Sequence, residues 1–164
     1  KKTIKKLKYV IIRLIKGEII MKIGIASDHR GYKLKEQLKE KITDIKVIDY
    51  GTDSEEICDY PDYAFKLGEA VASKEVDLGV AICGSGIGIG IACNKVKGIR
   101  CALVHDLFSA KATREHNDSN VLAMGGRVIG PGLAREIVSV WLTTEFMGAH
   151  HTARIEKISK YENA

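Results

Sequence analysis

The sequence predicts an α/β protein: a Rossmann-like three-layer α/β/α sandwich with a five-stranded parallel sheet and a C-terminal helix. From Met21 onward, short apolar runs alternate with segments of helical periodicity, a rhythm that is typical of parallel strands joined by crossover helices. The run at 78–83 is almost continuously apolar, as expected for a central parallel strand that is covered on both sides. Since such crossovers are right-handed, the helices should cover both faces of the sheet.

Five short apolar runs are assigned as strands, because each stands between segments of helical pattern. The second of them is ended by the triplet Gly51-Thr-Asp. In chain order the five runs occupy 23–26, 45–50, 78–83, 99–104 and 120–124.

Helices are assigned where apolar residues return every three or four positions. Leu34, Leu38 and Ile42 form one such stripe, and a second begins after Pro61. A glycine-rich loop precedes the third helix, and the last helix forms the C-terminal tail. In chain order the helices are expected at about 34–42, 61–71, 89–94, 110–115, 133–141 and 152–160.

The composition fits one globular domain. The chain has 164 residues, of which 45% are hydrophobic, 29% are charged and only two are proline. This length is close to that of one ordinary domain and too short for two well-packed ones, and so few prolines argue against a disordered chain. The formal net charge of +5 would by itself suggest a polyanionic partner, so the location of the charge matters.

The excess charge lies in a basic leader, residues 1–20. This segment has seven lysines or arginines and one acid, Glu18, so its net charge is +6; residues 21–164, with 19 basic and 20 acidic residues, have a net charge of −1. Nucleic-acid binding is therefore disfavoured, since no basic stripe or aromatic platform remains in the body of the protein. The leader lacks the apolar stretch and cleavage site of a signal peptide, and no segment approaches the ~20 apolar residues of a membrane span.

Two interpretations of the leader remain. Its apolar residues Ile4, Leu7, Ile11 and Leu14 fall at helical spacing, as in a basic amphipathic surface helix. Alternatively, the Lys-Gly-Glu at 16–18 is what a purine-rich ribosome-binding site would encode if it were read in frame. We favour the second interpretation, in which the leader is not part of the fold and residues 21–164 form a single domain; the intact mass of the native protein tests it.

Polar, titratable and glycine-rich groups follow four of the predicted strands. Because active sites in parallel α/β sheets lie at the carboxyl ends of the strands, we expect these groups to meet at one edge of the sheet. They are Ser27 to Gly31 after the first strand, Cys83 to Gly88 after the third, His105 and Asp106 after the fourth, and Gly125 to Arg127 after the fifth.

The loop at 84–88, Gly-Ser-Gly-Ile-Gly, can turn tightly and present N–H groups to an anion at the start of a helix. It is not a P-loop, because the lysine of GxxxxGK[ST] is missing, and it lacks the correctly placed acid of a dinucleotide fingerprint. The loop therefore indicates either an anion site or a tight turn required by packing.

The four cysteines show no CxxC or zinc-ligand spacing. Without an export signal we expect a cytoplasmic location, where thiols stay free. Cys58, Cys93 and Cys101 are interpreted as small buried hydrophobes. Cys83 differs, because it ends a buried strand and begins the glycine loop, where backbone amides and the helix N-terminus favour a thiolate.

Each remaining candidate has two interpretations. Asp28 and His29 either bind an anion or cap the helix that follows. His116, in a loop after a helix, suits either a proton donor or an anchored turn residue. Arg127 and Arg154 either grip a phosphate through their planar guanidinium groups or are solvated surface charges.

Six motifs, taken in order and spacing, resemble ribose-5-phosphate isomerase type B, and the similarity covers essentially all of residues 21–160. The same superfamily contains galactose-6-phosphate isomerase subunits and enzymes that accept allose 6-phosphate. The motifs are Ser-Asp-His-x-Gly at 27–31, Asp-Tyr-Pro at 59–61, Cys-Gly-Ser-Gly-Ile-Gly at 83–88, Asn-Lys-Val-x-Gly-Ile-Arg at 94–100, Arg-Glu-His-Asn-Asp at 114–118 and the helical tail around Arg154.

The resemblance implies an aldose–ketose isomerase that needs neither metal nor cofactor and interconverts ribose 5-phosphate and ribulose 5-phosphate in the pentose phosphate pathway. It implies that Cys83 is the base that moves a proton between C1 and C2, and that His116 opens the furanose ring. Backbone amides would stabilise the cis-enediolate, and Ser85 could add a hydroxyl. The loop residues concerned are Gly84, Ser85, Gly86, Ile87 and Gly88.

The remaining substrate contacts are implied in the same way. The phosphate would be held at the far end of the sugar, and this remote binding would position the sugar for proton transfer. The positions matching the phosphate ligands are His29, Arg127, His150 and Arg154, and those matching the ligands of sugar hydroxyls are Asp28 and Asn117.

Two positions depart from the family pattern. His150 stands where close relatives carry arginine; since histidine is shorter and only partly charged at pH 7, we expect a weaker phosphate affinity or a different sugar. Arg30 replaces a small residue, and it either reaches the substrate or faces water.

The resemblance further implies a homodimer, or a dimer of dimers, whose active site is completed across the interface. In that arrangement the regions of His116 and Arg127 from one subunit reach the Cys83 loop of the other. Two alternative functions stay open: an isomerase of allose 6-phosphate or galactose 6-phosphate, and a non-catalytic module that binds a phosphosugar or nucleotide without turnover. Retention of all the expected residues in one chain favours a self-sufficient homo-oligomer over the galactose type, which is expected to divide them between two different subunits.

Overall fold

Within residues 21–42 and 45–164, the part of the chain that this computed structural model describes, five parallel strands form one sheet. Their order is β2-β1-β3-β5-β4, and every neighbouring pair is parallel, so the predicted fold class is confirmed. The interpretation of the basic leader concerns residues outside this described part. The strands are β1 (Lys22–Ser27), β2 (Lys46–Asp49), β3 (Leu78–Cys83), β4 (Cys101–Leu103) and β5 (Val121–Gly125).

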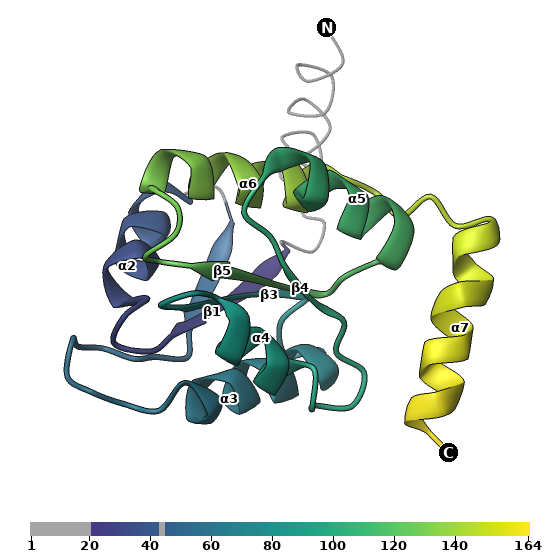
Figure 1. The fold of residues 1–164 in the computed structure, drawn as a ribbon, viewed down its shortest axis with the longest axis horizontal. Coiled ribbons are helices and arrows are strands. Elements are labelled where there is room, and N and C mark those ends of the chain that lie inside the picture. The colour runs from purple at the N-terminus through teal and green to yellow at the C-terminus, as the bar shows by residue number, and fades with distance from the viewer. Residues whose placement is uncertain (1–20, 43–44) are drawn as a thin grey trace, which may run out of the picture.

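Helices cover both faces of the sheet, as Figure 1 shows. Buried side chains of α2, α5 and α6 pack on one face, and those of α3 and α4 on the other. The last helix, α7, stands at the side of the molecule beyond the end of α5 (Figure 1). The bounds are α2 (Tyr32–Lys41), α3 (Tyr60–Ala72), α4 (Ile87–Cys93), α5 (Leu107–Asn117), α6 (Pro131–Thr143) and α7 (His150–Glu162).

The strand sequences explain this layering. Successive side chains of β1 point to opposite faces, so Ile23 and Ile25 join the core under α2 and α6 while Ala26 joins the core under α3. All six residues of β3 are buried, which is the environment predicted from its continuous apolar run. Gly24 is required by packing, because a Cβ there would lie 2.5 Å from the Leu67 side chain.

Two elements differ from the sequence prediction. The fourth strand is only three residues long, because the backbone amide of Arg100 donates its hydrogen bond to the side chain of Asn120 and not to a neighbouring strand. The helix after the glycine loop begins at Ile87, two residues earlier than expected, because Gly86 adopts φ +80° and turns the chain directly into the helix. Among the described residues, no helix is both long enough and apolar enough to cross a membrane.

The topology separates the two edges of the sheet. Strands β1, β3 and β5 end together, since Ser27 pairs with Ile82 and Cys83 with Gly125. A helix that connects two parallel strands runs back against them, so α5 begins at this carboxyl edge and ends near the opposite edge. Its eleven residues span about 16 Å.

Candidate functional site

Cys83 ends the central strand and lies almost wholly buried, with 4% of its surface exposed. Its Sγ accepts a hydrogen bond from the backbone N–H of Gly86 at 3.1 Å. Glycine is needed at 86, because its φ is +80° and a Cβ would lie 2.7 Å from the carbonyl carbon of Met124. The loop thus directs a backbone N–H at the sulfur and fixes the direction of the side chain.

The turn after β5 holds this loop in place. Gly126 donates its amide to the carbonyl of Cys83 at 2.8 Å, and Arg127 donates its amide to the carbonyl of Gly84 at 3.0 Å. His105, at the end of β4, accepts the amide of Gly125 on Nε2 at 3.0 Å. The groups that follow β3, β4 and β5 therefore meet at one edge, as the strand order predicted.

Asp28 lies at the same edge and is buried. Its Oδ1 accepts the backbone amides of Arg30 and Gly31, each at 2.9 Å. The expectation that Asp28 caps the following helix is therefore wrong in detail, since the N-cap of α2 is Gly31 and Asp28 braces the turn before it. Both bonds use Oδ1, which leaves Oδ2 available to a ligand.

His29 is held by the backbone of a distant loop, and it does not cap α2. Its Nδ1 lies 3.2 Å from the carbonyl oxygen of Cys58 and 3.3 Å from the amide nitrogen of the same residue. These contacts occupy Nδ1, and the partly buried ring has Nε2 as its second nitrogen for a ligand. Cys58 is therefore a support for this imidazole, and it is only partly buried.

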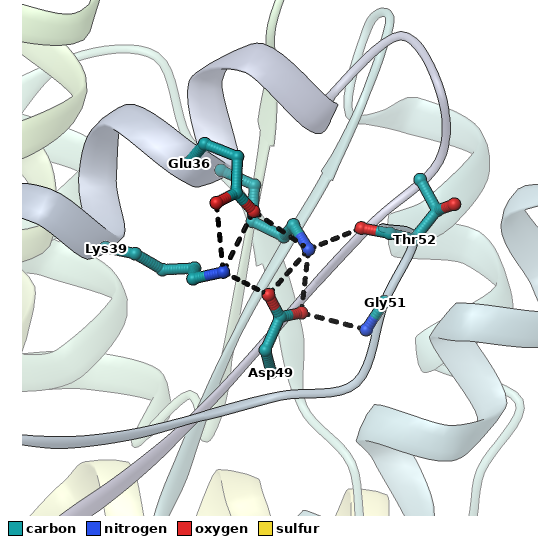
Figure 2. Close-up of polar contacts among 6 residues, drawn as sticks. Glu36, Lys39, Asp49, Gly51 and Thr52 are labelled. Carbon is teal, nitrogen blue, oxygen red and sulfur yellow. Dashed lines mark hydrogen bonds and ion pairs between the residues drawn. The ribbon is translucent and has the colours of Figure 1, made fainter. Parts of the chain in front are cut away.

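A network of buried charge fixes the turn that supports the end of β1 (Figure 2). The ammonium of Lys35, 1% exposed, donates to both carboxylate oxygens of Asp49 at 2.7 Å and to the carbonyl of Thr52. Lys39 also pairs with Asp49. Burial raises the pKa of Asp49, but the hydrogen bonds from the two lysines outweigh it, so the pKa of this carboxyl lies below its ordinary value.

The same turn is bonded to β1 through its backbone. Ser27 donates its amide to the carbonyl of Gly51 at 2.6 Å, and Thr52 donates its amide to the carbonyl of Ser27 at 2.8 Å. Gly51 in turn donates to Asp49 at 2.9 Å. The charges of Figure 2 are thereby connected to the residue directly before Asp28.

A second set of candidates gathers at the far end of α5. The ring of His116 stacks on that of His151 with centroids 4.5 Å apart and planes 16° from parallel, and the ring of His150 lies 4.0 Å from that of His151. Burial and the neighbouring charges of His150, His116 and Arg154 lower the pKa of His151. Asn117 follows His116, and its carbonyl accepts a bond from the Nε of Arg100.

The two sets lie apart in a single chain. The carboxyl-edge set contains Asp28, His29, the loop at 83–88 and Arg127. The histidine set, with Asn117 and Arg154, lies where α5 meets α7, and Figure 1 shows this junction apart from the start of α4. The length of α5, about 16 Å, separates the two edges.

Arg127 belongs to the loop of its own chain. Besides its amide bond to Gly84, its Cδ lies 3.7 Å from the position that a Cβ on Gly84 would occupy. The expectation that Arg127 reaches the Cys83 loop of another subunit is therefore wrong, because the turn after β5 docks on the loop after β3 within the chain. His116, in contrast, lies at the far end of α5, away from the Cys83 loop of its own chain.

The other thiols do not share the environment of Cys83. Cys93 is fully buried, and its Sγ donates to the carbonyl of Ala64. A hydrogen bond with Cys93, and then burial, raise the pKa of the Cys101 thiol well above its ordinary value. In the described part of the chain, no three histidine, cysteine or acidic side chains are grouped so that they could hold a metal ion.

Comparison with known proteins decides the family. The ribose/galactose isomerase family model matches residues 23–158. The chain belongs to this family. It is 61% identical over 145 residues to the YwlF protein of Bacillus subtilis, covering 87% of this chain and 97% of that one, and 46% identical over 143 residues to ribose-5-phosphate isomerase B of Escherichia coli, covering 86% and 96%. The structure of ribose-5-phosphate isomerase B from Clostridium thermocellum superposes with a TM-score of 0.85 at 50% identity, covering 87% of this chain and 98% of that one.

The resemblance seen in the motifs is thus confirmed, and the chain is an aldose–ketose isomerase of the sugar-phosphate class. Two supporting residues of this isomerase were not identified from its sequence: His151 and Lys35. His151 adjoins an identified residue, but its stacking depends on the angle between α5 and α7. From the sequence alone, Lys35 would be interpreted as a solvated lysine, because no local pattern links it to its partner Asp49.

Proposed function

We propose that this isomerase interconverts ribose 5-phosphate and ribulose 5-phosphate through a cis-enediolate. The observation that carries the proposal is the thiol of Cys83, buried at the carboxyl edge of the sheet with the N–H of Gly86 directed at its sulfur. Such an N–H orients the sulfur and its lone pairs for attack on a bound substrate. The alternatives, a hexose-phosphate isomerase and a binding module, lack an observation of their own.

The reaction is a proton transfer between neighbouring carbons. In the open-chain aldose, the Cys83 thiolate removes the proton from C2, the C1–C2 double bond forms, and the electrons of the C1 carbonyl move to O1. The thiol then returns the proton to C1 while the proton of the C2 hydroxyl moves to O1, which leaves a carbonyl at C2. Amides of the loop at 84–88 and the hydroxyl of Ser85 would hold the two oxygens while they carry negative charge.

The ring must open before this transfer. A general acid donates a proton to the ring oxygen while the C1 hydroxyl loses its own, and His116 has the side chain for this step. Its stacking partner His151 has a pKa that is lowered by burial and by the neighbouring charges of His150, His116 and Arg154.

Distance makes a second copy of the chain necessary for this mechanism. Cys83 lies at one edge of the sheet and His116 near the other, about 16 Å of helix apart, so one chain cannot bring both to one small sugar. We therefore propose a homodimer, or a dimer of dimers, in which the histidine set of one copy completes the Cys83 loop of the other.

An exposed apolar surface beside the loop supports this assembly. It extends over the outer face of α4, the edge strand β4 and the start of α5, where Phe108 is 80% exposed. Edge strands and exposed apolar side chains of this kind are normally covered by another surface. The apolar side chains concerned are Ile87, Ile91, Leu103, Leu107 and Phe108.

The phosphate would then be bound from both copies. His29 and Arg127 approach it from the edge that holds Cys83, and His150 and Arg154 from the histidine set. Asp28, through the free Oδ2, and Asn117 are the proposed ligands of the sugar hydroxyls. Binding energy from the phosphate would position C1 and C2 at the sulfur.

The experiment measures conversion of ribose 5-phosphate to ribulose 5-phosphate in the presence of a chelator. Wild type should be active, Cys83→Ala should lose at least about a thousandfold in kcat, and Cys101→Ala should retain the wild-type rate. A faster rate on allose 6-phosphate or galactose 6-phosphate would contradict the pentose assignment. Full activity of Cys83→Ala would contradict the thiolate base.

Complementation tests the shared site. Cys83→Ala and His116→Ala chains, each inactive alone, are mixed in equal amounts and allowed to exchange subunits. Half of the dimers are then mixed, and each has one intact site of two, so about a quarter of the wild-type activity should return. Exchange without any return of activity would contradict a site built from two copies.

A further inference from the structure

Arg30 and Arg127 lie over the same glycine of the loop. From the position that a Cβ on Gly84 would occupy, the Cδ of Arg30 is 3.2 Å away, its Cβ is 3.6 Å away, and the Cδ of Arg127 is 3.7 Å away. Two arginine stems, one from the turn after β1 and one from the turn after β5, therefore pack side by side on the residue that follows Cys83. Of the two, only Arg127 is so far assigned to the substrate.

The backbone of Arg30 is fixed. Its amide donates to the Oδ1 of Asp28 at 2.9 Å, and its carbonyl oxygen lies 2.9 Å from the position that a Cβ on Gly126 would occupy. A side chain that starts from so constrained a backbone and rests on Gly84 keeps its direction. The stem of Arg30 therefore lies along the loop, while the residue stays exposed, so that a ligand can reach its guanidinium from solvent.

The two guanidinium groups lack a counter-charge. Within the described part of the chain, neither Arg30 nor Arg127 forms a salt bridge, whereas Arg100 and Arg114 both pair with Asp118. The carboxylate nearest in sequence, Asp28, already accepts two backbone amides. Two like charges held on one glycine repel each other unless an anion lies between them.

We propose that Arg30 is a specificity-determining residue, whose guanidinium binds the phosphate monoester of the substrate together with that of Arg127. A phosphate has three oxygens that accept hydrogen bonds, and it accommodates two planar guanidinium groups. This inference rests on the proposed function for the identity of the sugar. The charge arrangement itself selects a phosphate whatever sugar carries it.

The test compares three variants with wild type. Arg30→Met keeps an unbranched stem on Gly84 and removes the charge, and Arg30→Lys keeps a positive charge without the planar fork. Arg135→Met is the matched control, since Arg135 is an exposed arginine of α6 beside the far end of α2, in a cavity with Gln37 and Lys41. The measurements are kcat and KM for ribose 5-phosphate, and the Kd of inorganic phosphate by calorimetry.

Arg30→Met should raise both the KM and the phosphate Kd about tenfold or more, since a hydrogen bond to a charged group has been lost, while kcat changes less than about threefold. Arg30→Lys should recover part of the loss, and Arg135→Met should match wild type. A thermal midpoint equal to that of wild type in Arg30→Met separates loss of contact from loss of structure.

Other outcomes overturn the proposal. A phosphate Kd and KM for Arg30→Met equal to those of Arg135→Met would refute the contact, and a fall in kcat at constant KM would place Arg30 at the reacting carbons instead. Should wild type fail to isomerise ribose 5-phosphate, the proposed function is refuted, and the phosphate Kd of the variants still decides the role of Arg30.

Discussion

Asp49→Asn tests how much the buried charge of Figure 2 depends on its partner. The substitution keeps the size of the side chain and removes the carboxylate charge. Lys35, 1% exposed, would keep the carbonyl of Thr52, one oxygen of Glu36 at 3.3 Å and the neutral amide oxygen of the new asparagine, but it would lose the carboxylate charge. An ammonium that loses its main counter-charge in the interior destabilises the folded state, because removing one partner of a buried pair costs about 3–5 kcal/mol.

We expect the lower end of this range, about 3 kcal/mol, since Asp49 is 28% exposed and Glu36 remains. For a chain of this size the melting temperature should then fall by about 6–12 °C. Lys35→Met should cost less, about 1–2 kcal/mol, because it removes the buried charge and leaves mainly the carbonyl of Thr52 without its donor.

The double variant makes the reasoning refutable. Because the Lys35→Met background has no buried ammonium, Asp49→Asn should cost little there, so the double variant should be more stable than the sum of the single changes by about 2–3 kcal/mol. Unfolding by urea and by heat, at one protein concentration and pH 7, measures all four proteins. Strict additivity, or an Asp49→Asn variant within about 0.5 kcal/mol of wild type, would refute a role for the buried pair.

Three further predictions follow from individual groups. Because the folded-state pKa of Asp49 is lowered, its stabilising contribution is complete above the unfolded-state value near 3.9 and is lost as the pH falls through the lower folded value, so Asp49→Asn should unfold with a shallower acid dependence between about pH 5 and pH 2. Gly86→Ala should destabilise the protein by about 2 kcal/mol or more, since alanine is strained at φ +80° and meets Met124, and unfolding curves that overlay wild type would contradict this. His150→Arg should tighten inorganic phosphate binding about threefold or more by calorimetry, because a guanidinium offers a planar pair of donors that an imidazole lacks; a Kd equal to that of wild type would exclude position 150 from the phosphate.

The sequence predicted the sheet well, because its signals are local. The strand at 78–83 was placed to the residue, since an unbroken apolar run of this length between two helical patterns is typical of a buried parallel strand. The length of the edge strand was overestimated. Ile99 and Arg100 are residues typical of a strand, but their backbone amides donate hydrogen bonds to Val96 and to the side chain of Asn120. Composition cannot show which hydrogen-bond partner a residue meets.

The site was predicted in part for the same reason. Cys83 and its loop are contiguous, so their neighbourhood could be inferred from the strand order. The stacking of His116 on His151, and the position of Arg127 on Gly84, depend on how elements far apart in the chain pack, which no local pattern contains. The direction of α5 had the largest consequence, because it separates residues that the motifs place together.

If the proposed homodimer forms, that direction also governs how catalysis responds to dilution. A site that needs His116 of one copy and Cys83 of the other would be incomplete in a monomer, so the association equilibrium of the chains would set the concentration of sites. Below the dissociation constant of the dimer, the rate per chain would fall in proportion to concentration, while the KM of the surviving dimers stays constant. Through the length of one helix, the specific activity of the proposed dimer would then depend on the concentration of the enzyme.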